Sequence, residues 1–145
     1  IVALDGSAAS EVCLAPARQV ARGFGAALIL LHVIEPLWAA GDSASAGDSA
    51  SADQQAQEVR RIHERLRNLA AQLAQEGISA RPLIARGEPA GEIQSQIERR
   101  RGDLLCLSTS SRGPVGRLFF GTVAQKLMGF VRVPVIAVRR ERSPG

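Results

Sequence analysis

The chain has 145 residues, of which 46% are hydrophobic and 22% charged, and this size and balance predict one globular domain over residues 1–145. The composition excludes a disordered protein, and no stretch reaches the roughly 18 uninterrupted apolar residues of a membrane-spanning helix. The net charge of +4 hides a gradient, since residues 1–57, 58–98 and 99–145 sum to −4, 0 and +8. The basic last third fits a nucleotide phosphate, a nucleic acid or only a solvated surface.

The cysteines and the start of the chain bear on the compartment. Cys13 and Cys106 each lie inside an apolar run, far apart in the sequence, as is typical of buried thiols rather than of a disulfide or a metal site. No charged and cleavable leader precedes the first apolar run, so we predict a cytosolic protein. The chain begins at Ile1 without a methionine, and we expect a few residues to precede it.

The first elements are a short strand and an alanine-rich helix. Residues 1–4 are an apolar run that predicts a strand, and Asp5-Gly6-Ser7 closes it with Ser7 as the N-cap of the next helix. The segment from there to about Arg22 predicts that helix. Pro16 falls inside it and predicts a kink.

The next three segments are a strand, a loop and a long helix. Residues 27–34 are apolar except for His32, as in a strand that is covered on both faces of a parallel sheet. A buried, hydrogen-bonded histidine is a better interpretation of His32 than a metal ligand, because no second ligand stands at a suitable spacing. Residues 41–52 repeat one polar hexapeptide and predict a surface loop. Residues 52–76 carry apolar side chains every three or four positions, which predicts an amphipathic helix.

The second half continues the alternation of strands and helices. Strands are predicted at 78–85, 104–107 and 133–138, with helices following Gly87-Glu88-Pro89 and covering about 118–131. Strands that alternate with helices imply right-handed parallel crossovers. The sequence therefore predicts an α/β fold in three layers, with helices on both faces of an open parallel sheet.

In such folds, ligands bind beyond the carboxyl ends of the strands, so the turns after the first, second and fourth strands are the places to search. The segment from Ser108 to Gly121 is rich in serine and glycine, contains Arg112 and Arg117, and leads into Gly121-Thr122 at the start of a predicted helix. A helix N-terminus presents unpaired N–H groups that bind phosphate. An ordinary polar loop with a helix-start threonine explains the same residues, and both interpretations stay open here.

Several segments together resemble the universal stress protein family. They are the opening Ile-Val-Ala-Leu-Asp-Gly-Ser, Leu-Leu-His-Val-Ile, Gly-Glu-Pro, Asp-Leu-Leu-Cys-Leu-Ser, Leu-Phe-Phe-Gly-Thr-Val-Ala and Val-Pro-Val-Ile-Ala-Val, in order over nearly the whole chain. The resemblance implies a Rossmann-like five-stranded sheet of order 3-2-1-4-5 and homodimers that pair through edge strand five. In one branch of the family it implies ATP, with Mg²⁺, between strands one and four.

The ATP-binding branch has a glycine pattern that this chain keeps in part. Its pattern is Gly, two residues, Gly, nine residues, then Gly followed by Ser or Thr. Gly121-Thr122 matches the end, and the spacing puts Ser108 and Ser111 at the two earlier glycines. A serine at Ser111 costs on the order of 1 kcal/mol if that turn needs a positive φ.

The resemblance also implies site residues. It puts Asp5 near the ribose or a bound metal, and Val33 and Leu107 near adenine. Along the ribose and phosphates it puts six more residues, namely Ser108, Ser111, Arg112, Gly121, Thr122 and Val123. We therefore predict a stress-response module that binds an adenine nucleotide, with no metal held by the protein alone.

Two other functions are alternatives to nucleotide binding. A stress protein that binds no nucleotide and acts through protein contacts fits the two serines, and a slow ATPase is the weaker alternative because no general base with a partner stands near the loop. We thus favour binding over catalysis. The arginines at 99–101 and 139–142 have no aromatic platform beside them, so a solvated surface explains them better than nucleic acid binding. The fifth strand is an apolar sheet edge, which a homodimer partner would cover.

Overall fold

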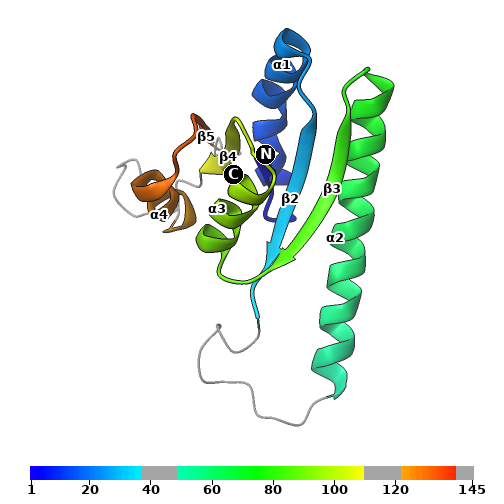
Figure 1. The fold of residues 1–145 in the computed structure, drawn as a ribbon. Coiled ribbons are helices and arrows are strands. Elements are labelled where there is room, and N and C mark those ends of the chain that lie inside the picture. The colour runs from blue at the N-terminus through cyan, green and yellow to red at the C-terminus, as the bar shows by residue number, and fades with distance from the viewer. Residues whose placement is uncertain (37–48, 110–121, 140–145) are drawn as a thin grey trace, which may run out of the picture.

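The computed structural model describes residues 1–36, 49–109 and 122–139, and within these ranges strands and helices alternate along the chain (Figure 1). The strands are β1 (Val2–Ala3), β2 (Leu28–Ile34), β3 (Ala80–Arg86), β4 (Leu105–Thr109) and β5 (Val135–Arg139). The helices are the 3₁₀ helix η1 (Ala8–Cys13) and the α-helices α1 (Leu14–Phe24), α2 (Ser49–Gln75), α3 (Pro89–Arg99) and α4 (Thr122–Phe130). Within the described ranges, no helix has the length and apolar character that crossing a membrane requires.

The five strands form one parallel sheet of order β3-β2-β1-β4-β5, which confirms the predicted topology. Val2 of β1 pairs with Leu30 on one side and with Cys106 on the other, so the short first strand lies at the centre of the sheet. The chain adds strands outward from β1 first on one side and then on the other. The strand order therefore reverses between β1 and β4, and their carboxyl ends lie beside each other.

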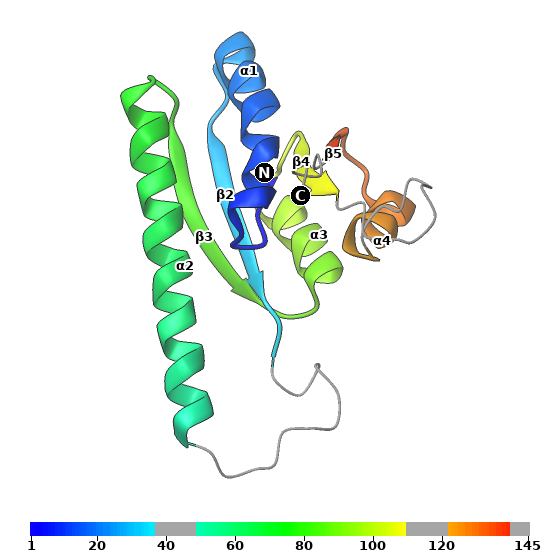
Figure 2. The ribbon, with the colours of Figure 1, turned by 180° about the vertical axis from the view of Figure 1, so that it is seen from behind.

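Helices cover both faces of this sheet, which confirms the three layers (Figures 1 and 2). Neighbouring residues of β2 point to opposite faces, because side chains alternate along a strand. Leu30 packs in a core with α1 and α2, whereas Leu31 packs in a second core with α3 and α4. Leu66 and Leu73 of α2 are almost fully buried in the first core, and Leu127 of α4 is buried in the second.

The predicted first helix is divided into two elements. Ser7 is the N-cap, as predicted, and its side chain accepts a hydrogen bond from the backbone N–H of Ser10 at 3.2 Å, but the helix that it caps is η1. The α-helix α1 begins only afterwards, so Pro16 lies in its first turn. Proline is tolerated there because first-turn N–H groups have no partner within the helix. Pro16 therefore gives no reason for the kink that was predicted inside the helix. Gly25 ends α1 in the left-handed conformation with φ of 62°.

The long helix begins earlier than the sequence pattern predicts. α2 starts at Ser49, so residues 49–52 of the predicted loop 41–52 belong to the helix, and residues 41–48 lie outside the described ranges. Alanine is the strongest helix former, and a helix that already exists adds residues cooperatively at its end. The helix therefore extends into the second copy of the repeat. In both views α2 continues beyond the sheet (Figures 1 and 2).

Candidate functional site

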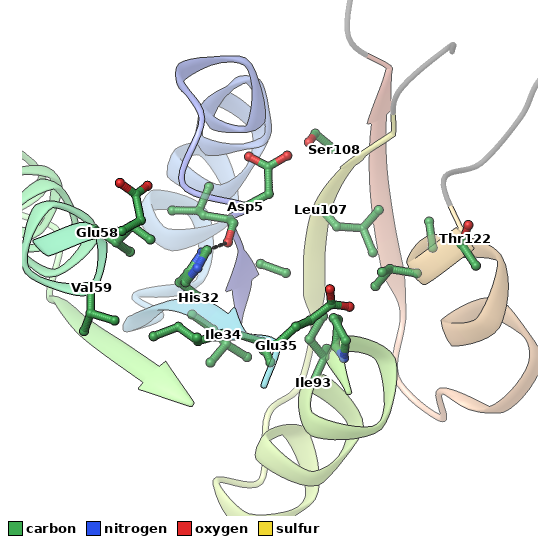
Figure 3. A pocket seen from close by; sticks show the side chains of 18 of the residues that line it. Asp5, His32, Ile34, Glu35, Glu58, Val59, Ile93, Leu107, Ser108 and Thr122 are labelled. Atoms are coloured by element: carbon green, nitrogen blue, oxygen red, sulfur yellow. Dashed lines mark hydrogen bonds between the residues drawn. The ribbon is translucent and has the colours of Figure 1, made fainter. Parts of the chain in front are cut away.

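A cavity of about 880 Å³ opens at the carboxyl ends of β1, β2 and β4 (Figure 3). The turns after these strands form part of its wall, and α2, α3 and α4 close its sides. This is the edge of the sheet where the strand order reverses, the position at which open α/β sheets bind their ligands. The fold thus brings segments from most of the chain to one site.

The floor of the cavity is apolar and its rim is polar. Ala3, Leu31 and Leu107 from the strands contribute to the floor, together with Ile93 of α3 and Leu127 of α4. The rim is lined by Asp5, Glu35, Gln54, Gln55, Glu58, Ser108 and Thr122. A ligand with a flat apolar ring and several polar groups fits this arrangement, because the ring can be buried while the polar groups reach hydrogen-bonding side chains.

Local hydrogen bonds orient the turn after β1. The backbone N–H and the hydroxyl of Ser7 donate to Oδ1 of Asp5 at 2.9 and 2.5 Å, and the N–H of Asp5 donates to the Ser10 hydroxyl at 3.3 Å. Gly6 has φ of 83°, a conformation that side-chain-bearing residues rarely adopt. The carboxylate of Asp5 is therefore held at the rim by its own turn and needs no ligand to order it.

His32 supports the same turn from β2. Its ring is buried, and Nδ1 lies 2.9 Å from the carbonyl oxygen of Leu4, the residue before Asp5 (Figure 3). A carbonyl only accepts hydrogen bonds, so Nδ1 carries the proton. The ring also lines the cavity. His32 is thus a hydrogen-bonded structural histidine, as its sequence context predicts.

An ion pair joins the two helices on the other side of the cavity. Glu88 is the N-cap of α3, and its carboxylate accepts from the backbone N–H of Gly91 at 2.7 Å and from Nζ of Lys126 in α4 at 2.9 Å. These two donors, the Gly91 N–H first, hold the pKa of Glu88 below its usual range. The pair thereby fastens α4, which carries Thr122 and Val123, to α3.

The structure brings together six of the nine predicted site residues. They line the cavity and are Asp5, Val33, Leu107, Ser108, Thr122 and Val123. The other three, Ser111, Arg112 and Gly121, lie outside the described residues.

The sequence prediction missed the part of the wall that α2 provides. Gln54, Gln55 and Glu58 lie on the face of α2 that continues from Val59 and Ile62 toward its N-terminus. The predicted helix 52–76 already contains these three positions, but the sequence search covered only the turns after the strands, and helical spacing does not tell which part of a helix meets the end of a strand.

A second, polar cavity of about 530 Å³ lies on the other side of the β1 turn, and Glu58 and Ile62 line both cavities. Its arginines are paired with carboxylates: Arg61 Nη1 lies 3.3 Å from Glu58 Oε2, and Arg65 Nε lies 2.5 Å from Glu11 Oε1. Glu58, which lines both cavities, is therefore paired with an arginine that lines only the second.

Comparisons with known proteins agree on one family. The model of the universal stress protein family matches residues 1–139. A universal stress protein of Thermus aquaticus is 28% identical over 96% of this chain and 96% of its own length. The universal stress protein YxiE of Bacillus subtilis is 26% identical over 96% of this chain and 97% of its own.

Solved structures of the same family share the fold at lower identity. A universal stress protein of Archaeoglobus fulgidus has a TM-score of 0.72 at 21% identity, covering 94% of this chain and 95% of that one. A structure of that organism's protein in complex with dAMP has a TM-score of 0.67 at 18% identity, covering 94% of both chains. A family protein of Arabidopsis thaliana with AMP bound has a TM-score of 0.59 at 18% identity, covering 90% of this chain and 77% of that one.

Proposed function

Since the chain belongs to the universal stress protein family, we propose that it binds an adenine nucleotide in the cavity between β1 and β4. The observation that carries this proposal is the convergence of six predicted site residues on one cavity with an apolar floor and a polar rim. The solved family members with dAMP and AMP support it, because they share the fold and hold the same class of ligand.

In our proposal each end of the nucleotide has its own contacts. In our proposal the adenine ring lies on Val33 and Leu107, and the Asp5 carboxylate accepts from the ribose hydroxyls. The phosphates lie toward Ser108 and the N-terminus of α4 at Thr122, whose unpaired N–H groups favour an anion. Ser111, Arg112, Gly121 and Val123 complete the phosphate end in the same proposal.

ATP with Mg²⁺ is the form of the ligand that we propose from the phosphate end. The described residues contain no group of three His, Cys, Asp or Glu side chains that could hold a metal ion. In our proposal Mg²⁺ is held by the phosphates, and Asp5 lies near the ribose or the metal. The two cysteines are buried and neither forms a disulfide, which supports a reducing compartment such as the cytoplasm.

We further propose a homodimer that pairs through β5. This strand is at the edge of the sheet, and Val135, Ile136 and Val138 are only half-buried. On the adjoining helix α4, Met128 and Phe130 are exposed. A second β5 would cover this edge. Light scattering at micromolar concentration should give the mass of a dimer, and a monomer would exclude this pairing.

Calorimetric titration of AMP and ATP into nucleotide-stripped protein tests the binding site. We expect heat of binding and a higher melting temperature, since a ligand at 100 times its Kd adds about 2.7 kcal/mol of stability. Absence of both at millimolar nucleotide would exclude the proposed function.

Two variants locate the ligand. Asp5→Asn should weaken binding about tenfold if the carboxylate accepts from the ribose, because hydrogen bonds to charged groups contribute about 1.5–3 kcal/mol. Asp53→Asn is the matched control. It is the same substitution at an exposed position of α2 that does not line the cavity. Gly121→Asp should abolish binding by adding a carboxylate at the phosphates, and normal ATP binding by this variant would exclude the assigned phosphate end.

A further inference from the structure

The inward face of α2 is a stripe of apolar side chains that ends in a polar one. The stripe runs toward the N-terminus of the helix in steps of three and four residues. It begins at Leu73, which is buried in the first core, and continues to Ile62 and Val59, which line the cavity. The next step of four residues leads to Gln55, which lines the cavity as well.

Gln55 thus breaks the apolar pattern where α2 reaches the cavity. An apolar residue is expected at this place in an inward stripe. Gln55 is half-buried, whereas Gln57 on the same helix is exposed and lines neither of the two cavities. A polar side chain that interrupts a buried stripe at the wall of a cavity is typical of a residue that contacts a ligand, because local patterning rules are broken mainly at functional sites.

α2 and α4 lie on opposite sides of the cavity. Figure 3 shows Glu58 and Val59 of α2 on one side, Thr122 at the N-terminus of α4 on the other, and Asp5 between them. In the proposed function the phosphates lie at Thr122 and the ribose at Asp5. The base then extends from the ribose toward α2, and its edge farthest from the sugar faces that helix.

We infer that Gln55 recognises the base, with its amide bound to the edge of adenine that carries N1 and the 6-amino group. This inference rests on the proposed function and names the residue that reads the base. An amide side chain presents a donor and an acceptor next to each other. The Nε2 group donates to N1, which only accepts, while Oε1 accepts from the 6-amino group. Because Gln55 is half-buried, these two hydrogen bonds are partly shielded from water.

Two ligands that differ only in the 6-amino group test this contact. AMP and the 5′-monophosphate of purine riboside, in which a hydrogen atom replaces that group, are titrated calorimetrically into the whole protein. We expect the wild type to bind AMP about tenfold more tightly, because the analogue leaves the acceptor of the Gln55 amide unpaired.

Gln55→Leu removes the amide without disturbing the helix. Leucine continues the apolar stripe and is a good helix former, so the variant should fold. The 6-amino group then has no partner in α2, and AMP and the analogue should bind about equally. Gln57→Leu is the matched control, since it is the same substitution at an exposed position of α2 outside both cavities, and it should keep the preference for AMP.

Gln55→Glu replaces the donor of the amide with a second acceptor. A carboxylate only accepts hydrogen bonds, so it repels N1 of adenine, whereas guanine presents two donors at this edge, the N1–H and the 2-amino group. The affinity for GMP relative to AMP should therefore rise about tenfold over the wild-type ratio. The added negative charge acts equally on both monophosphates, so the ratio isolates the contact with the base.

The outcomes separate this inference from the proposed function. If AMP binds but the wild type does not prefer it to the analogue, Gln55 does not read the base, while nucleotide binding stands. The same conclusion follows if Gln55→Leu loses affinity for both ligands equally and keeps the preference, or if Gln55→Glu leaves the GMP-to-AMP ratio unchanged. If neither ligand binds the wild type, both the inference and the proposed function are wrong.

Discussion

The imidazole Nδ1 of His32 lies 2.9 Å from the carbonyl oxygen of Leu4 and joins β2 to the turn that carries Asp5. This contact spans 28 residues of sequence and lies beneath the rim of the cavity (Figure 3). It links β2 to the turn that carries Asp5, whose side chain we propose to bind the ribose. Changes in this small region should therefore affect both stability and nucleotide affinity.

The His32 contact gives the first prediction. His32→Phe keeps a ring but removes the donor to Leu4, and we expect it to lower the free energy of unfolding by about 1–3 kcal/mol, the cost of a buried polar group that loses its partner. His32→Gln retains a hydrogen-bond donor, so its free energy of unfolding should fall by less than that of His32→Phe. Urea unfolding of the two variants measures the difference. Equal stability of the two would mean that the hydrogen bond contributes nothing.

Gly6 gives the second prediction. A Cβ atom at this position would lie 3.4 Å from Ile62 Cγ1 and 3.5 Å from His32 Cε1, and φ is 83°. A methyl group fits in this space, but residues with a side chain rarely adopt this backbone conformation. Gly6→Ala should therefore destabilise the protein by about 1–2 kcal/mol. It should also weaken nucleotide binding, because relief of the strain would move Asp5.

Gly23→Ala is the matched control for that variant. Gly23 lies within α1, and nothing is within 4 Å of its added Cβ. Alanine is the better helix former by about 1 kcal/mol, so this substitution should raise the melting temperature. If Gly6→Ala also raised it, the left-handed conformation of the β1 turn would be contradicted.

The Glu88 carboxylate gives a prediction about pH. Its pKa is lowered in the folded protein by the Gly91 N–H and by Lys126, so folding favours the ionised form. The stabilisation is therefore complete above the ordinary glutamate pKa of about 4.5 and is lost as the pH falls through the lowered value. The stability difference between the wild type and Glu88→Gln should be largest near neutral pH and should shrink in acid.

Lys126→Met separates the two partners of Glu88. It removes the ion pair but leaves the hydrogen bond from the Gly91 N–H to the Glu88 carboxylate. Because the ion pair is half exposed, we expect the free energy of unfolding to fall by less than about 1 kcal/mol. Chemical unfolding at several pH values measures both variants. A Glu88→Gln difference that persists undiminished at about pH 3 would contradict the role of the ionised carboxylate.

The cysteines give a prediction about reactivity. Burial raises the pKa of the Cys106 thiol, and Cys13 is completely buried, so little thiolate is accessible in the native protein. A thiol-specific chromogenic disulfide at pH 8 should react slowly with the folded protein and rapidly after denaturation in urea. Equal rates in the two states would contradict the burial of both thiols.

The sequence predicted the order and type of the elements well, because hydrophobic periodicity is a local property. The continuous apolar run at 27–34 and the helical spacing in α2 each identified their element, and the structure confirms both. The boundaries were less certain where two signals competed. At residues 49–52 a polar repeat predicted a loop, but alanine propensity and the existing helix extended α2 instead.

By itself, the sequence determined a parallel α/β sheet with the turns after three strands as the places where a ligand would bind, and its resemblance to a family supplied the strand order. Only the tertiary structure decided that Gln54, Gln55 and Glu58 approach those turns from α2, and that His32 supports the Asp5 turn. The physical reason is distance along the chain. Periodicity records which face of an element is buried, whereas the packing of α2 on the sheet decides which of its residues meet the end of β1.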